Sequence, residues 1–316
     1  MFDLSPDDIT DGPVLRAMLV LAAPLLVQNL VQVVQQVVDL FWLGRLGGSA
    51  VAAIALVFPV YNLLFALTAF VPFVGTQILV SQRVGGDDTE GARRALFTGL
   101  AVAIAVSVLV GGATVLLAAD LLGLFALVRP DVSTEAVVLD LAATYLSVTA
   151  LGLPVLLLSD TTEAGFLGWG DSKTAMRMNV VAVGVNVVLD PLLIFGYAGF
   201  PELGIAGAAL AGVVGYGVGG CYGYVRLARG AHGGMLSRAA ATLDLGEVRK
   251  LFDIGAPIAG QNVAKQLADV VLVTVAFAVG GSVALAAWAV GVRVAALAVI
   301  AAGGLQQAAQ SVIGQN

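Results

Sequence analysis

Long apolar runs dominate the chain, and polar residues interrupt the first of them at a regular spacing. The run from Val14 to Leu43 exceeds the roughly 20 residues that cross a bilayer as a helix. Within it, polar residues recur at i, i+4, i+7, i+8 and i+11, namely Gln28, Gln32, Gln35, Gln36 and Asp39. This spacing places all five on one helical face, and we call them the polar stripe. The rest of the helix is Val, Leu and Ala apart from Asn29, so we expect that face to meet lipid and the stripe to meet protein or a water-filled cavity.

Further runs of similar length predict an all-α polytopic membrane protein with about eight transmembrane helices. The expected spans are residues 14–43, 51–81, 95–119, 136–166, 174–197, 204–227, 247–280 and 283–313. Of the 316 residues, 59% are hydrophobic and 11% are charged, against about 45–50% and about 25% in soluble domains. The composition therefore agrees with the pattern of runs.

Basic residues are distributed unevenly over the connections. Eleven lie in the N-terminal segment and after the second, fourth and sixth runs, whereas the opposite side holds only Arg45 and Arg129. Because short cytoplasmic loops are rich in Lys and Arg, the N-terminus is expected in the cytoplasm. We expect the protein to lie in the cell membrane of a prokaryote. Its acidic, lysine-poor composition suggests a halophilic archaeon as the source, although ordinary acidic prokaryotic proteins have the same composition.

An internal repeat appears when the chain is shifted by 233 residues (257 − 24 = 233). The shift aligns Ala23-Pro24 with Ala256-Pro257, Gln28-Asn29 with Gln261-Asn262, and Gly47-Gly48-Ser49 with Gly280-Gly281-Ser282. Six helices per unit make the repeats parallel. We expect a six-helix lobe (residues 1–230), an interlobe cytoplasmic connection (231–246) and the first two helices of a second lobe (247–316). If the second copy is complete in the gene, four more helices follow, and this chain is a fragment.

Ionisable residues inside apolar runs are costly and are functional candidates by default. Asp39 ends the polar stripe, and its counterpart in the second unit is Leu272. Asn186 and Asp190 lie four residues apart on one face of the fifth helix. With the backbone carbonyl freed before Pro191, these oxygens make a hard site suited to Na⁺ or a proton. Spacing alone equally allows hydrogen bonds between helices.

Other polar residues of the spans are candidates for lining a substrate cavity. Besides Gln28, Gln32 and Gln35 of the stripe, they are Tyr145, Asp160, Glu163 and Arg293. Tyr145 and Asp160 share a face of the fourth helix, and Tyr145 could equally pack or anchor at the interface. Glu163 is interpreted first as a residue whose carboxylate extends to water at the cytoplasmic end of the fourth helix. Arg293 has no local partner, so it could hold an anionic substrate or pair with an acid elsewhere.

Residues 168–171 read Gly-Trp-Gly-Asp, a GxGD pattern seen in intramembrane aspartyl proteases, so an enzyme is an alternative function. That chemistry needs a second aspartate, usually after a tyrosine, and no aspartate here follows one. A turn is the favoured interpretation of the pattern. His232, the only histidine, lies in a glycine loop, so no cofactor or histidine-based site within the membrane is expected. No basic groove for nucleic acid is present.

The chain resembles the multidrug and toxic compound extrusion (MATE) family over its whole length. The motifs are the first helix with its VVDLFWLGRLGGSAVAA ending, GWGDSKTAM, NVVLDPLLIF and GIAGAALAG. The resemblance implies two six-helix lobes around a central cavity, exporting cationic or amphipathic drugs in exchange for Na⁺ or H⁺. It places ion coupling at Asp39, Asn186 and Asp190, and further polar positions at Tyr145 and Asp160.

Two positions depart from the family pattern. Members usually carry arginine where Leu167 stands and often a hydroxyl residue where Gly212 stands. The nearest alternative function is a lipid-linked oligosaccharide flippase of the same superfamily, which is expected to carry more cationic residues in its cavity. We expect small-molecule substrates and the lipid bilayer as partners, no nucleic acid, and a monomer when the protein is full length.

Overall fold

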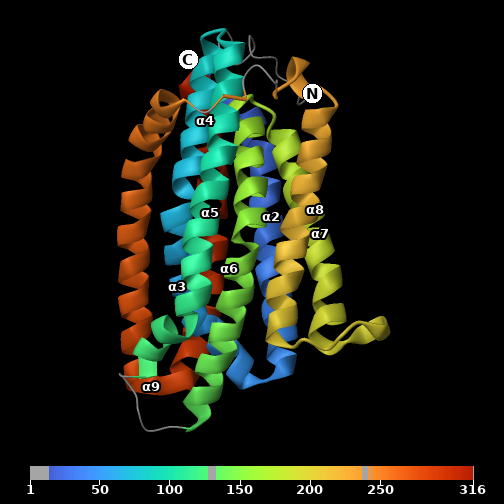
Figure 1. The fold of residues 1–316 in the computed structure, drawn as a ribbon. Helices are drawn as coiled ribbons and strands as arrows, with labels where there is room; N and C mark the ends of the chain where they lie inside the picture. Colours follow the sequence, from blue (N-terminus) through green and yellow to red (C-terminus); the bar gives the residue numbers. More distant parts are fainter. Residues whose placement is uncertain (1–13, 127–132, 237–240, 243, 316) are drawn as a thin grey trace.

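The computed structural model is a bundle of long helices that run roughly along one axis (Figure 1). It describes residues 14–126, 133–236, 241–242 and 244–315, and no strand occurs in these ranges. The long helices are α2 (Val14–Leu46), α3 (Gly48–Thr68), α4 (Phe70–Gly85), α5 (Thr89–Ala126), α6 (Ser133–Gly168), α7 (Ser172–Phe195), α8 (Ile205–Ala228) and α9 (Leu245–Gln315). Within the described ranges, six helices are long and apolar enough to cross a membrane. The predicted all-α membrane fold class is confirmed, while the number of eight spans stays a prediction.

The second predicted span is divided into α3 and α4. The division falls at Ala69, whose N–H still donates to Phe65 O at 2.7 Å. Pro72 follows in the first turn of α4 and has no N–H to donate to the carbonyl of Thr68. The hydroxyl of Thr68 donates to Leu64 O at 2.8 Å. The interruption of this apolar run thus coincides with a missing backbone donor.

The last two predicted spans form the two arms of α9. Gly281 separates them, with φ 59° and ψ −152°, which is not a helical conformation. Glycine adopts a positive φ without the steric cost that a Cβ would bring. The arms run in opposite directions, so residue 245 and the C-terminus lie at the same end of the bundle (Figure 1). We call this end, where the N-terminus also lies, the terminal end, and the opposite one the far end.

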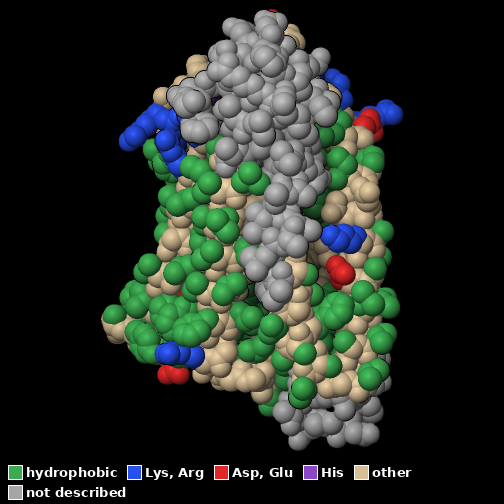
Figure 2. Space-filling view, turned by 180° about the vertical axis from the view of Figure 1, so that it is seen from behind, with side chains coloured by type: hydrophobic (Ala, Val, Ile, Leu, Met, Phe, Trp, Pro, Cys, Tyr) green, Lys and Arg blue, Asp and Glu red, His purple; other side chains and the backbone are tan. Residues whose placement is uncertain are grey.

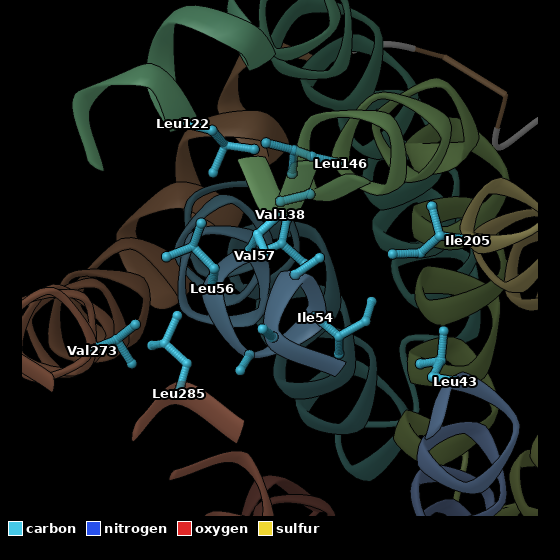
Figure 3. Close-up of a cluster of buried hydrophobic side chains, with 14 of the residues drawn as sticks. Leu43, Ile54, Leu56, Val57, Leu122, Val138, Leu146, Ile205, Val273 and Leu285 are labelled. Carbon is cyan, nitrogen blue, oxygen red and sulfur yellow. The ribbon is translucent and has the colours of Figure 1, made fainter. Parts of the chain in front are cut away.

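Hydrophobic clusters occupy both ends. At the far end, Leu43, Ile54, Leu122, Val138 and Ile205 pack together from the ends of five helices (Figure 3). Val273 and Leu285, on either side of Gly281, join the same cluster. At the terminal end, a second cluster includes Leu79, Leu96, Phe166, Trp169 and Met178. The middle of the bundle contains polar side chains besides further hydrophobic contacts, such as those of Ala103, Leu153 and Leu157.

Glycines bring α7 and α8 close together. A Cβ on Gly207 would lie 2.4 Å from Leu193 O, on Gly215 2.5 Å from Ala182 O, and on Gly219 2.5 Å from Met178 O. Any side chain at these positions would force the two helices apart. This packing fixes the lateral position of α7, which carries Asn186 and Asp190.

The terminal end also joins α9 to α4. A Cβ on Gly75 would lie 2.8 Å from Leu251 O, and one on Gly255 would lie 2.7 Å from the Cα of Val71. Arg83 at the end of α4 pairs with Glu247 at the start of α9 at 2.8 Å. Between the two ends, one flank of the molecule presents mainly hydrophobic side chains, as a membrane-spanning bundle requires (Figure 2).

Candidate functional site

The polar stripe of α2 lines a cavity of about 450 Å³ in the middle of the bundle. All five residues of the stripe contribute to its wall. The outward face of α2 is apolar, with side chains between 47% and 54% exposed at Val27, Leu30, Val34, Val37 and Phe41. The helix therefore has the two faces that the spacing predicts. Partners from α6 and α7 divide the polar residues around the cavity into two layers.

The first layer surrounds Glu163 and consists of Gln28, Gln32, Glu163 and Asn179; we call it the Glu163 layer. Gln28 Nε2 donates to Glu163 Oε1 at 2.7 Å, and Asn179 Nδ2 donates to Glu163 Oε2 at 2.6 Å. Gln32 Nε2 donates to Asn179 Oδ1 at 2.9 Å. Both carboxylate oxygens thus accept hydrogen bonds from neutral amides, which ties α2, α6 and α7 together.

The interpretation of Glu163 as a residue that extends to water at the end of its helix is wrong. Its side chain is 5% exposed and is held by two other helices. Asn179 was missed from the sequence. It precedes Asn186 by seven residues, two helical turns, so its place on the same face of α7 was the available signal.

The second layer consists of Gln35, Asp39, Asn186 and Asp190; we call it the Asp190 layer. Gln35 Nε2 donates to Asn186 Oδ1 at 2.6 Å, and Asn186 Nδ2 donates to Asp190 Oδ1 at 3.2 Å. Asp39 lies within hydrogen-bonding reach of Asp190. Asp190 is 1% exposed, and its Oδ2 accepts no hydrogen bond from the described residues. The structure thus brings together the three residues Asp39, Asn186 and Asp190 that the sequence singles out.

The two layers are separated along the bundle. Gln28 and Asp39 are eleven residues apart on α2, as are Asn179 and Asp190 on α7, which corresponds to about 16 Å of helix rise. The Glu163 layer lies toward the terminal end and the Asp190 layer toward the far end. One cavity is therefore in contact with two distinct acidic groups.

Aromatic side chains form much of the remaining wall. Phe58, Tyr61 and Phe65 of α3 follow one another at ring distances of 6.1 Å. Tyr145 and Asp160 of α6 also line the cavity, in agreement with their predicted common face. Neither Lys nor Arg is among the described residues of the lining. The side chain of Arg293, the one cation proposed for the cavity, lies outside the described side chains.

The GxGD segment forms a turn, as predicted. Gly170 has φ 80°, and Asp171 is the N-cap of α7, accepting from the N–H of Thr174 at 2.9 Å. His232 Nε2 lies 3.0 Å from the Oδ2 of Asp171. Burial alone would raise the pKa of this carboxyl, but hydrogen bonds with His232 and Thr174 hold it at about 2. Asp171 therefore stabilises the start of α7 and its connection to the loop after α8.

Three side chains with oxygen ligands are available for a cation in the Asp190 layer. They are the carboxylates of Asp39 and Asp190 and the amide of Asn186, all hard oxygen donors that suit Na⁺. The part of the chain that the structure describes contains no group of three or more His, Cys, Asp or Glu residues that could hold a metal. The set fits a monovalent cation or a proton better than a transition metal.

Comparisons with known proteins agree with the fold. The MatE family model matches residues 24–192, more than half of the chain. A probable multidrug resistance protein NorM of Rhizobium meliloti is 31% identical over 309 residues, covering 95% of this chain and 62% of that protein. A FAD transporter of Shewanella oneidensis is 27% identical over 311 residues, covering 98% of this chain and 66% of that protein.

A solved structure has the same fold. The outward-facing conformation of a multidrug resistance MATE family transporter of the MOP superfamily superimposes with a TM-score of 0.85 at 23% identity. The match covers 99% of this chain and 67% of that one. The chain thus spans about two thirds of the length of these proteins.

Proposed function

The chain belongs to the MatE family of membrane transporters, and on that premise we propose that the protein of which it is part is a secondary antiporter. It exports drug-like organic cations or amphipathic compounds in exchange for Na⁺ or H⁺. The exchange runs across the cell membrane of a prokaryote, with the terminal end of the bundle in the cytoplasm.

The observation that carries the proposal is the facing pair of carboxyl groups at Asp39 and Asp190. If both are ionised, neither has a proton to donate, and Asp190 Oδ2 has no donor among the described residues. Two adjacent like charges are unfavourable away from water, so a shared proton or a Na⁺ would stabilise the pair. A site that is favourable only when it holds a cation can exchange that cation during transport.

Binding of the cation would also change the contacts between α2 and α7. Asp39 is on α2, and Asp190 is on α7 with Asn186, which already accepts from Gln35 of α2. An occupied site draws the two helices together, whereas an empty one leaves two like charges to separate them. The differential contact supplies the free energy that couples ion entry to a conformational change.

The wall of the cavity supports a cationic substrate. Asp160 and Glu163 add two acidic groups, and Tyr61 and Phe65 offer ring faces that attract cations. An anionic substrate, such as a lipid-linked oligosaccharide phosphate, would meet carboxylates and no described Lys or Arg. The FAD transporter among the relatives therefore does not make FAD the preferred substrate here. The protease alternative loses its support, because Asp171 caps a helix and has His232 as its partner.

Reconstitution of the full-length protein in proteoliposomes tests the proposal. Accumulation of a fluorescent organic cation such as ethidium is measured with an imposed Na⁺ gradient, an imposed pH gradient, or neither. Accumulation driven by one of the gradients, and abolished by an ionophore that collapses it, is the expected result. Accumulation that is equal under all three conditions would refute antiport.

A further inference from the structure

At the terminal end, three helices meet around one arginine. Arg83 lies in the last turn of α4, and its Nη2 donates to the Oε1 of Glu247 in the first turn of α9 at 2.8 Å. Its Nη1 donates to the Oδ2 of Asp88, in the turn before α5, at 2.7 Å. The side chains of Arg83 and Glu247 are 19% and 8% exposed, so water and salt screen this pair only weakly. Arg83 therefore joins helices from the two sides of the predicted interlobe connection.

Both members of this pair have a second partner on their own side of the contact. Asp88 follows Arg83 by five residues. Lys250 follows Glu247 by three residues on α9, and its Nζ donates to Glu247 Oε1 at 2.9 Å. Breaking a buried ion pair is costly when it leaves a charge alone away from water. Here the loss of the bond between Arg83 and Glu247 leaves Arg83 with Asp88 and Glu247 with Lys250, so the contact can open without an unpaired buried charge.

Close packing continues the contact between α4 and α9 beyond the ion pair. Gly75 and Gly255 bring the two backbones together, and Leu251 is fully buried in a hydrophobic cluster that includes residues of α4. At the far end, by contrast, Val273 and Leu285 of α9 lie in a hydrophobic cluster. A path between α4 and α9 toward the terminal end would therefore require both the packing and the ion pair to separate.

We propose that Arg83, Asp88, Glu247 and Lys250 form a releasable latch, the terminal latch, which closes the molecule between α4 and α9 at the terminal end. In the closed state Arg83 bonds to Glu247 across the contact. In the open state each of the two charges keeps the partner on its own side. The inference rests on the proposed antiport, which requires the cavity to open to one side of the membrane at a time. The latch then sets the population of the state that opens toward the terminal end.

The arrangement predicts shifts of opposite sign for two acidic residues that bond to the same arginine. Glu247→Gln removes the charge that bonds to Arg83 across the contact, so the ratio of open to closed molecules should rise by about fivefold. In the closed state Asp88 shares the guanidinium with Glu247, whereas in the open state Asp88 is its only carboxylate partner. Asp88→Asn should therefore disfavour opening and lower the same ratio several-fold. A merely structural role would lower stability in both variants without this opposite shift.

Double electron–electron resonance on the full-length protein measures the two populations without any gradient. Spin labels are attached to cysteines introduced at Gln82 of α4 and Phe252 of α9, two exposed positions near the latch, in an otherwise cysteine-free background. The matched control is Glu90→Gln, which breaks the ion pair of Glu90 with Arg93, 3.3 Å apart within α5. This control should leave the distribution of label distances unchanged, because its ion pair does not cross the contact.

Further variants keep the latch testable if Glu247→Gln does not fold or if wild type is almost entirely closed. Arg83→Gln breaks the same bond from the other side and should also raise the open population. Gly255→Ala would place a Cβ 2.7 Å from the Cα of Val71, so it favours separation of α4 and α9. Adding Asp88→Asn to Gly255→Ala should then restore part of the closed population. An unchanged open population in folded Glu247→Gln or Arg83→Gln, or an increase on adding Asp88→Asn, would overturn the latch.

The results also separate the terminal latch from the proposed function. If the label distances shift as expected while no gradient drives transport in proteoliposomes, antiport fails and the latch stands. If a gradient drives transport while Glu247→Gln and Asp88→Asn leave the label distances unchanged, antiport stands and the latch fails.

Discussion

The Glu163 layer and the Asp190 layer contain similar groups, yet only Glu163 has both carboxylate oxygens hydrogen-bonded by the protein. Glu163 accepts from two amides, and its layer connects three helices by hydrogen bonds of 2.6 to 2.9 Å. Asp190 accepts from Asn186 at 3.2 Å and faces the second acid, Asp39. A carboxylate whose acceptors are filled by the protein stabilises the fold, whereas one that faces a like charge needs a cation from outside. The difference separates a structural role from a functional one within a single cavity.

The comparison predicts that removal of Asp190 impairs transport, whereas removal of Glu163 lowers stability. The largest expected effect is the one on transport. Asp190→Asn should reduce gradient-driven transport to background, because the facing pair can no longer hold a cation. Stability should stay within about 1 kcal/mol of wild type, since an amide at this position can donate to Asp39 and removes a like charge. Transport in proteoliposomes and thermal unfolding in detergent measure the two quantities. Asp140→Asn is the matched control, and transport by Asp190→Asn at the wild-type rate would contradict the role.

Glu163→Ala should lower stability instead. It leaves the amide donors of Gln28 and Asn179 without their acceptor, at a cost of about 1–3 kcal/mol for each buried group. We expect the free energy of unfolding to fall by about 2–4 kcal/mol, and Glu163→Gln, which retains a carbonyl acceptor, to lose less. Unfolding in detergent followed by near-UV circular dichroism measures the change. If Glu163→Ala were as stable as wild type, the two amide hydrogen bonds to Glu163 would not stabilise the fold.

Gly215→Ala should disturb one layer more than the other. Its Cβ would lie 2.5 Å from Ala182 O and 3.1 Å from the Cβ of Asn186, so α8 must move away from α7 beside the Asp190 layer. Overpacking of this kind costs about 1–3 kcal/mol. We expect reduced stability together with reduced affinity for the coupling ion, measured by isothermal titration with Na⁺ or by proton release. Gly212→Ala, three residues earlier on α8, adds its Cβ to open space and should change neither quantity.

Local spacing made the polar stripe of α2 predictable, because the direction of a side chain on a helix depends only on its position along that helix. The residues that bind the stripe could not be predicted in the same way. Glu163 is 135 residues from Gln28, and nothing near it in sequence indicates that two amides from other helices enclose it. Its burial was therefore missed, and Asn179 with it. The Asp190 layer was found because Asn186 and Asp190 are local neighbours on α7.

The internal repeat also shows that local sequence does not determine the partners of a polar residue. Gln28-Asn29 of α2 and Gln261-Asn262 of α9 are equivalent in sequence. Gln28 Nε2 donates to Glu163 of another helix, whereas Asn262 Nδ2 donates to Ile258 O of its own helix at 2.9 Å. Equivalent sequences therefore do not specify their hydrogen-bond partners, because partners from other helices are set by the packing of the whole bundle.

The smallest predicted effect concerns Gly212, where members of the family often carry a hydroxyl residue. Gly212 lines the cavity, and a Cβ built there meets no atom within 4 Å. Gly212→Ser therefore adds a hydroxyl oxygen without moving α8. If the Asp190 layer binds Na⁺ through carboxylate and amide oxygens, one more hard ligand should raise Na⁺ affinity by about threefold. Gly212→Ala separates the effect of the oxygen from that of the added carbon, and both variants are titrated with Na⁺ at constant ionic strength. Equal affinities in the two variants would mean that position 212 lies outside the coordination sphere, which would leave Asp39, Asn186 and Asp190 as the side chains that hold the ion.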